Sequence, residues 1–199
     1  VGLRDALFSL DDGATWAIST LPPWNGINRA LVATSATTYL TVQPTNVYRS
    51  TDSGANWVIV PGVPNNINVD LFFYATVNGY LLQSFTNPGV NGGRIYKTVD
   101  GGLTYASVLD LPSLAGWKVG ESPRRIVAST SGDTAYLLTS HGVWRITALN
   151  TVPVAVQLVV FDQVGSFMNV EPGVANIVLG TSGYDGLGAD NYRIYDDLQ

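Results

Sequence analysis

The chain has 199 residues and a mass of 21.2 kDa, enough for one domain with a sizeable hydrophobic core. Its net charge of −5 and pI near 4.6 argue against nucleic acid as a partner, because phosphate binding requires a basic surface. The absence of cysteine excludes disulfide bonds and thiolate zinc sites, and no apolar run is long enough for membrane insertion.

The single histidine limits the possible chemistry further. His141 rules out a multi-histidine metal centre and leaves little room for Ser-His-Asp catalysis. It precedes Gly142 in an expected turn, so we interpret it as a solvated loop residue. The sequence therefore predicts no catalytic histidine and no resident metal or cofactor.

One pattern, Ser/Thr-x-Asp-x-Gly-x-Thr/Asn-aromatic, occurs three times in the first half of the chain. Its defining residues are Ser9, Asp11, Gly13 and Trp16, then Ser50, Asp52, Gly54 and Trp57, then Thr98, Asp100, Gly102 and Tyr105. The glycine permits the positive φ of a tight hairpin, and the aspartate accepts hydrogen bonds from its own turn. The aromatic residue starts the next strand and carries apolar area into the core. Because an active site is rarely triplicated, we expect a structural role rather than catalysis or metal binding.

This pattern resembles the Asp-box, or BNR, repeat of β-propellers. The repeat occurs in sialidases, sortilin-type receptors, some glycoside hydrolases and photosystem-assembly-factor-like proteins. The resemblance implies an all-β propeller whose boxes lie on the rim, away from the binding face. The boxes begin at residues 9, 50 and 98, and degenerate copies are expected near 147 and 194. Such spacing is typical of a four-stranded propeller blade.

Alternating and β-branched residues then predict the strands between the boxes. In chain order they are expected at 3–9, 16–19, 29–34, 38–42, 47–50, 57–60, 71–77, 80–85, 94–98, 105–109, 125–129, 135–139, 143–147, 154–161, 167–170, 176–179 and 192–195. With the strands of a blade lettered A to D and the box between C and D, the order reads CD, ABCD, ABCD, ABCD, ABC.

These seventeen strands close neither a four-bladed nor a five-bladed ring, which need sixteen and twenty. An open propeller would expose strand edges, which natural proteins avoid. We therefore predict a single β-propeller domain over residues 1–199 with about four to five blades of four antiparallel strands. It is expected to be part of a larger propeller, completed by other subunits or by the rest of a longer chain.

Binding is expected on the face opposite the boxes, where the D–A and B–C loops emerge. The D–A loops are expected at 21–28, 61–70 and 110–124, and the B–C insertions at 86–93 and 181–191. Loop aromatics beside amides and carboxylates suit stacking on a sugar ring or a protein hot spot. The candidate ligand-binding residues are Trp24, Asn25, Asn65, Trp117, Glu121, Tyr184 and Asp185. The alternative is that Trp24 and Trp117 fold back and fill gaps between blades.

A calcium site is a weaker prediction from the Gly-rich loop that contains Asp185 and Asp190. Carboxylate oxygens suit Ca²⁺, but the loop lacks the ligand spacing of an EF-hand. A plain loop is the favoured interpretation.

The resemblance to sialidases also raises an enzyme alternative, a glycoside hydrolase or sialidase-like protein. Tyr192-Arg193-Ile194-Tyr195 is similar to their Phe/Tyr-Arg-Ile-Pro motif, but the proline is replaced and the motif lies near the C-terminus. Glycosidase chemistry needs two facing carboxylates, and Glu121 with Asp185 is the best available pair.

The favoured hypothesis is a non-catalytic binding or structural module that contacts a glycan or a protein through the loops opposite the boxes. Its composition favours an exposed location, secreted, on a cell surface or on a virion. A purely architectural subunit is the third possibility, and nucleic acid and membrane insertion are excluded as partners.

Overall fold

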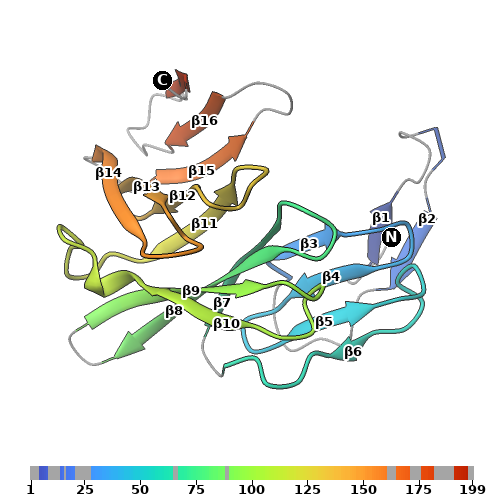
Figure 1. Cartoon of the computed structure of the whole chain (residues 1–199). Coiled ribbons are helices and arrows are strands. Elements are labelled where there is room, and N and C mark those ends of the chain that lie inside the picture. Colours follow the sequence, from blue (N-terminus) through green and yellow to red (C-terminus); the bar gives the residue numbers. More distant parts are fainter. Residues whose placement is uncertain are drawn as a thin grey trace.

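The structure is a computed structural model. It describes residues 14–15, 28–64, 67–85 and 92–160 with their side chains, and the backbone alone of strand residues 5–8, 17–20, 86–87, 90–91, 165–170, 176–181 and 191–196. The described residues form seventeen strands and one short 3₁₀ helix (Figure 1). The helix, η1 (Leu111–Ser113), has three residues, and the described part of the chain contains no helix long and apolar enough to cross a membrane.

The strands form five antiparallel sheets in chain order. β1 (Asp5–Phe8) pairs with β2 (Ala17–Thr20), and the next three sheets have four strands each. The first of these contains β3 (Ala30–Ala33), β4 (Tyr39–Val42), β5 (Val47–Ser50) and β6 (Val58–Ile59). The second contains β7 (Ile67–Phe73), β8 (Gly79–Asn87), β9 (Val90–Thr98) and β10 (Ala106–Asp110). The third contains β11 (Pro123–Ala128), β12 (Ala135–Thr139), β13 (Gly142–Thr147) and β14 (Val154–Val160). The last sheet has β15 (Gly165–Val170), β16 (Asn176–Thr181) and β17 (Asn191–Asp196).

This grouping confirms the predicted strand order and the all-β class. Figure 1 shows the sheets following one another around an arc, and the first strands of successive sheets, β3, β7, β11 and β15, are in contact along its inner side. Each sheet is therefore a blade of a β-propeller, with its A strand innermost and its D strand at the rim.

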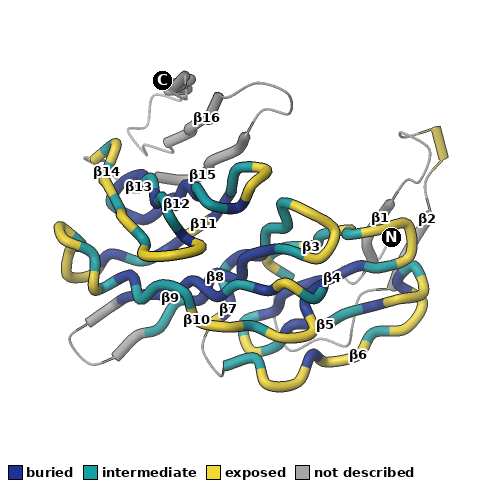
Figure 2. The backbone as a smooth tube through the Cα atoms, viewed as in Figure 1, coloured by how far each residue is buried: buried dark blue, intermediate teal, exposed yellow. Residues whose placement is uncertain are grey.

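The core lies between neighbouring blades. One cluster joins Tyr80 and Leu82 of β8 to Leu137 of β12 and Trp144 of β13. A second joins Leu40 of β4 to Leu81 of β8. Figure 2 shows buried backbone along these middle strands, and β4 and β12 are buried at every position. A middle strand faces a neighbouring blade on both sides, which explains why its sequence reads as a continuous apolar run.

Two predicted loops are partly strand. β7 begins at Ile67 rather than at 71, because Asn68 is buried and satisfied there: its side-chain N–H donates to the Gln43 carbonyl at 2.9 Å and its Oδ1 accepts from Gln83 at 2.7 Å. The predicted insertion at 86–93 belongs to a long β8–β9 hairpin, in which residue 86 pairs with residue 91.

The two described boxes form the same hydrogen-bonded turn. In the second box, Asp52 Oδ1 accepts from Ser50 Oγ and from the Asn56 N–H, both at 2.8 Å, and the Gly54 N–H donates to Ser50 Oγ at 2.9 Å. The Asn56 backbone and side chain, followed by Ser50, lower the pKa of Asp52 to about 2. Each carboxylate thus serves its own turn, as expected of a structural repeat.

The third box repeats this arrangement from Thr98 to Tyr105. Asp100 Oδ1 accepts from Thr98 Oγ1 at 2.8 Å and from the Thr104 N–H at 2.9 Å. Burial raises the pKa of Asp100, but the hydrogen bonds from Thr104 and then Thr98 outweigh it, so that the pKa falls to about 2. Gly102 has a φ of +82°, and a Cβ there would lie 2.2 Å from Leu40 of the preceding blade.

Basic residues of the C strands connect each blade to the next turn. Arg49 Nε donates to the Gly101 carbonyl at 3.2 Å, and Lys97 Nζ donates to Asn150 Oδ1 in the turn of the degenerate box near 147. These two basic side chains therefore have a structural role between neighbouring blades. Of the first box only Ala14 and Thr15 are described, so Ser9, Asp11, Gly13 and Trp16 lie outside the described residues. At the box position near 194 the structure describes only the backbone of β17.

Candidate functional site

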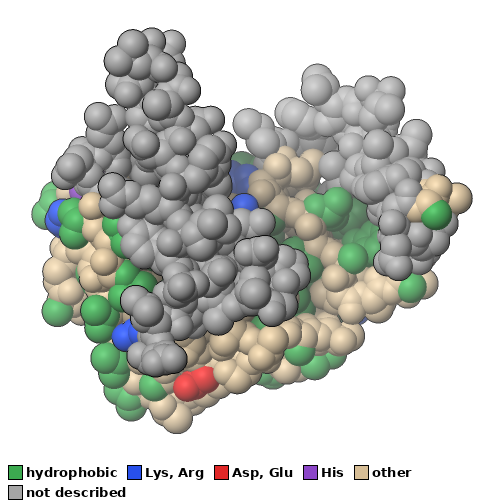
Figure 3. All heavy atoms as spheres, turned by 90° about the horizontal axis from the view of Figure 1, so that it is seen from above, with side chains coloured by type: hydrophobic (Ala, Val, Ile, Leu, Met, Phe, Trp, Pro, Cys, Tyr) green, Lys and Arg blue, Asp and Glu red, His purple; other side chains and the backbone are tan. Residues whose placement is uncertain are grey.

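A cavity of about 430 Å³ opens on the inner side of the arc, where three A strands meet. Its lining residues are Arg29, Ala30, Leu31 and Val32 at β3, Val69, Asp70, Leu71, Phe72 and Phe73 on β7, and Arg124 and Arg125 on β11. The D–A loops lead into the starts of β3 and β11, where the arginines lie, and the lining continues to Phe73 at the end of β7. Figure 3 shows basic and hydrophobic side-chain atoms together on the inner side of the arc.

Three arginines of this cavity are exposed, and the described lining has one carboxylate, Asp70, to offset their charge. Arg29, Arg124 and Arg125 make no side-chain hydrogen bond or ion pair with the described part of the chain, whereas Arg49 and Lys97 bond to the next blade. A guanidinium group has five N–H donors in a planar fork that fits a carboxylate or phosphate. Three such groups around one cavity therefore give it a positively charged surface, in a protein whose net charge is −5.

A strand irregularity explains why two successive arginines are exposed. The pairing of β11 with β12 shifts between Pro123 and Arg125, so that Arg124 and Arg125 are both exposed where regular alternation would turn one of them inward. Bulges of this kind commonly redirect side chains at sites. β7 has a similar shift between Asn68 and Asp70.

Asp70 is the one carboxylate among the described residues of the lining. Its side chain is largely buried, and its Oδ2 accepts a hydrogen bond of 2.9 Å from the Ile126 N–H on β11, which connects two blades. Burial raises the pKa of Asp70 to about 6, although the Ile126 N–H and the positive charge of Arg125 act in the opposite direction. The cavity thus contains an acid that titrates near neutral pH.

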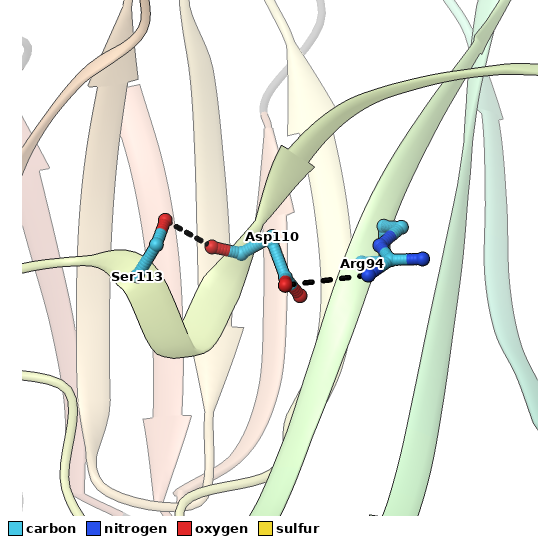
Figure 4. A network of polar contacts seen from close by, with 3 residues as sticks. All are labelled: Arg94, Asp110 and Ser113. Atoms are coloured by element: carbon cyan, nitrogen blue, oxygen red, sulfur yellow. Dashed lines mark hydrogen bonds and ion pairs between the residues drawn. The ribbon is translucent and has the colours of Figure 1, made fainter.

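A second polar cluster shows how a paired arginine differs from those in the cavity. Figure 4 shows Asp110, at the end of β10, between Arg94 on β9 and Ser113 in η1. Arg94 Nη2 lies 3.2 Å from Asp110 Oδ2, and Ser113 Oγ donates to the Asp110 carbonyl at 2.6 Å. Hydrogen bonds to Tyr96 and then to Asp110 raise the pKa of Arg94. In this cluster the two charges offset each other, although Arg94 Nε and Asp110 Oδ1 are buried without a hydrogen-bond partner among the described residues.

Trp117, a predicted ligand-binding residue, is half-buried against the core. Its ring lies 6.0 Å from that of Trp144, and its indole N–H is buried without a partner among the described residues. Trp117 therefore folds back onto the core cluster that contains Trp144.

Glu121, predicted beside it, has 0% of its surface exposed. Its Oε1 accepts from Thr139 Oγ1 at 2.5 Å and from Trp144 Nε1 at 2.8 Å, and its Oε2 accepts from the Lys118 N–H at 3.0 Å. The carboxylate therefore holds the loop onto β12 and β13, and a ligand could reach it only by displacing these bonds.

The remaining predicted ligand and calcium residues lie outside the described residues. They are Trp24, Asn25, Asn65, Tyr184, Asp185 and Asp190. His141 stands at the β12–β13 turn, half-buried, with its Nδ1 2.8 Å from Ser140 Oγ. Within the described ranges, no three His, Cys, Asp or Glu side chains are grouped so that they could hold a metal ion.

The sequence interpretation missed the arginine cavity. Arg29 and Arg125 stand at the starts of predicted strands and Arg124 at the end of a predicted loop, and none of the three is among the predicted site residues. The available signal was their position, because basic residues stand at the start of the A strand in two blades out of three. An A strand lines the inner side of a propeller, so its first residues converge even when they lie far apart in the sequence.

No family model matches this sequence, and no curated protein matches it. Solved structures do match its fold. The structure of YCF48 bound to a D1 peptide matches with a TM-score of 0.59 and 20% identity, covering 89% of this chain and 56% of that one. A GH74 xyloglucanase from Xanthomonas campestris matches with 0.64 and 17% identity, covering 96% of this chain and 32% of that one.

A GH74 enzyme from Niastella koreensis matches with a TM-score of 0.61 and 19% identity, covering 89% of this chain and 29% of that one. The chain therefore spans between 29% and 56% of the length of these three structures. At these identities the matches establish the β-propeller fold alone.

Proposed function

We propose that this chain is a non-catalytic β-propeller module that binds a protein segment carrying carboxylates, and that the inner cavity is the binding site. The observation that carries the proposal is the set of three exposed guanidinium groups, from β11 and the start of β3, that form no hydrogen bond or ion pair in the described structure and share a single buried carboxylate, Asp70. Like charges that converge without a partner disfavour the unbound state, and a bound anion removes that cost.

The lining favours a peptide over a neutral glycan. Beside the arginines it has an apolar wall that includes Val32, Leu71 and Phe72, which suits a segment with both acidic and apolar side chains. A neutral sugar can accept hydrogen bonds from arginine but has no negative charge to offset three guanidinium groups. YCF48, one of the matching propellers, was solved with a D1 peptide bound, which provides a precedent for peptide binding on this fold.

The enzyme alternative receives less support from the same residues. Hydrolysis of a glycosidic bond needs two carboxylates on either side of it, and the described lining provides Asp70 alone. Glu121, the other candidate, is buried and fully hydrogen-bonded. The likeness to GH74 enzymes concerns the fold and not these residues.

Other features of the proposed function remain predictions from the sequence. They are an exposed location (secreted, on a cell surface or on a virion), completion of the propeller by other subunits or a longer chain, and contributions from the loops that contain Trp24, Asn25, Asn65, Tyr184 and Asp185.

The proposal can be tested with an array of extended peptides in matched pairs that carry Glu in one member and Gln in the other. We expect the protein to bind Glu members selectively. The variant Arg124→Gln should lose this binding, whereas Arg145→Gln, the same charge change on β13 outside the cavity lining, should keep it. Equal binding of the two members, or equal loss in the two variants, would overturn the proposal.

A further inference from the structure

We propose that Asp70 makes binding at the inner cavity pH-dependent, so that an anionic ligand binds more tightly when Asp70 carries a proton. This inference rests on the proposed function, because it concerns how the same cavity is regulated. It follows from the position of one buried carboxyl group in the wall of a cavity whose other charges are all positive.

Asp70 is held in this wall by contacts from two blades. It lies on β7, it is 9% exposed, and its Oδ2 accepts from the Ile126 N–H of β11 at 2.9 Å. Ile126 directly follows Arg124 and Arg125 in the same strand. The carboxyl group therefore cannot move away from the arginines without breaking the contact between the two blades.

The charged groups around Asp70 come from two neighbouring elements. The start of β3 contributes Arg29 to the lining, and β11 contributes Arg124 and Arg125. β4 and β8 also pack against β7, and their described residues carry no charge. Their phenols bond elsewhere: Tyr39 Oη donates to the Ala36 carbonyl at 3.2 Å, and Tyr80 Oη donates to the Gly132 carbonyl.

The ionised carboxylate and an anionic ligand compete for the same positive charge. When Asp70 is ionised it offsets one guanidinium group and repels a ligand carboxylate, and when it is protonated all three arginines act on the ligand. Since burial raises the pKa of Asp70 to about 6, this change falls between pH 5 and 7. A bound anion adds a like charge and raises the pKa of Asp70 further, so binding takes up a proton and tightens as the pH falls.

The test uses a peptide selected from the array, resynthesised with cysteic acid in place of Glu so that its own charge stays constant over the range. Fluorescence anisotropy measures its affinity for the protein from pH 5 to pH 8. For the wild type we expect the affinity to rise about tenfold as the pH falls, the change produced when binding raises the Asp70 pKa by one unit.

Two variants separate Asp70 from other causes. Asp70→Asn keeps an oxygen acceptor for the Ile126 N–H and removes the negative charge, so it should bind tightly throughout and lose the pH dependence. His141→Gln replaces the single histidine of the chain, which lies outside the cavity lining, and should keep the wild-type profile. A flat wild-type profile, or the same profile in Asp70→Asn, would overturn the inference while leaving anion binding established.

Proton uptake gives a second measurement that does not depend on how well Asp70→Asn folds. Calorimetry at pH 6.5 in two buffers of different ionisation enthalpy should show a fraction of a proton taken up per peptide bound by the wild type and by His141→Gln. No uptake would refute the role of Asp70. No peptide binding at any pH would instead refute the proposed function, and this inference with it.

Discussion

Replacing Thr139 with valine removes a hydroxyl group from the buried carboxylate of Glu121 and leaves the size of the side chain almost unchanged. Thr139 Oγ1 donates to Glu121 Oε1 at 2.5 Å and accepts from the His141 N–H at 3.1 Å. A hydrogen bond to a charged group is worth about 1.5–3 kcal/mol and a neutral one about 0.5–1.5 kcal/mol. Because Glu121 is fully buried, water does not replace the lost donor.

We therefore expect Thr139→Val to lower the free energy of unfolding by about 3 kcal/mol, or roughly 6–12 °C in Tm for a chain of this length. Urea unfolding followed by tryptophan fluorescence measures the change, with Thr139→Ser as the matched control. The serine variant keeps the hydroxyl and loses one methyl group, which costs about 1 kcal/mol. If valine were no more destabilising than serine, the structural role assigned to Glu121 would be wrong.

Three further predictions concern charged residues. Asp52 and Asp100 have folded-state pKa values of about 2, below the ordinary 3.8. The stability that they add above pH 4 should therefore be lost as the pH falls toward 2. In an acid titration followed by circular dichroism, Asp100→Asn should flatten this part of the curve. The pH dependence of stability from Asp70 has the opposite sign: with a pKa of about 6, the stability present below pH 4 is lost as the pH rises through 6. In urea unfolding at pH 7.5, Asp70→Asn should therefore be up to about 3 kcal/mol more stable than the wild type. A destabilised variant would contradict the burial argument. Arg124→Gln should change the free energy of unfolding by less than about 0.5 kcal/mol, because the Arg124 guanidinium has no hydrogen-bond or ion-pair partner in the described structure. Arg49→Gln should cost about 1 kcal/mol, because it removes the hydrogen bond to the Gly101 carbonyl. A larger loss of stability in Arg124→Gln than in Arg49→Gln would count against the division between ligand-facing and structural arginines.

Most of the fold could be predicted from the sequence because the repeat encodes local physics. Gly54 and Asp52 build their turn from their own neighbours, so the pattern that marks the turn also explains it. The strand order could be predicted as well, because the boxes divide the chain into blades. The boundaries that were missed, such as the start of β7, depend on the partners of Asn68 in the neighbouring strands, which no local pattern encodes.

The site was harder to predict because its residues lie far apart in the sequence and come together only in the folded propeller. Trp117 and Glu121 were predicted as binding residues because they are an aromatic residue and an acid in a long loop, the usual composition of binding loops. In the structure both hold that loop against the blade. Arg29 and Arg125 are ordinary in their local sequence. Their importance comes from the propeller geometry, which brings the starts of two A strands together, and from a register shift that no composition reveals.

The affinity for one Glu-containing peptide from the array, compared with its Gln counterpart, tests the central claim most directly. Fluorescence anisotropy at pH 6 and low salt should show the Glu peptide binding at least tenfold more tightly to the wild type and to Arg145→Gln, and this preference should disappear in Arg124→Gln. Added salt should weaken the binding, because exposed charge pairs are screened. If the Gln peptide bound equally well, or if Arg124→Gln kept the preference, the inner cavity would not be the carboxylate site.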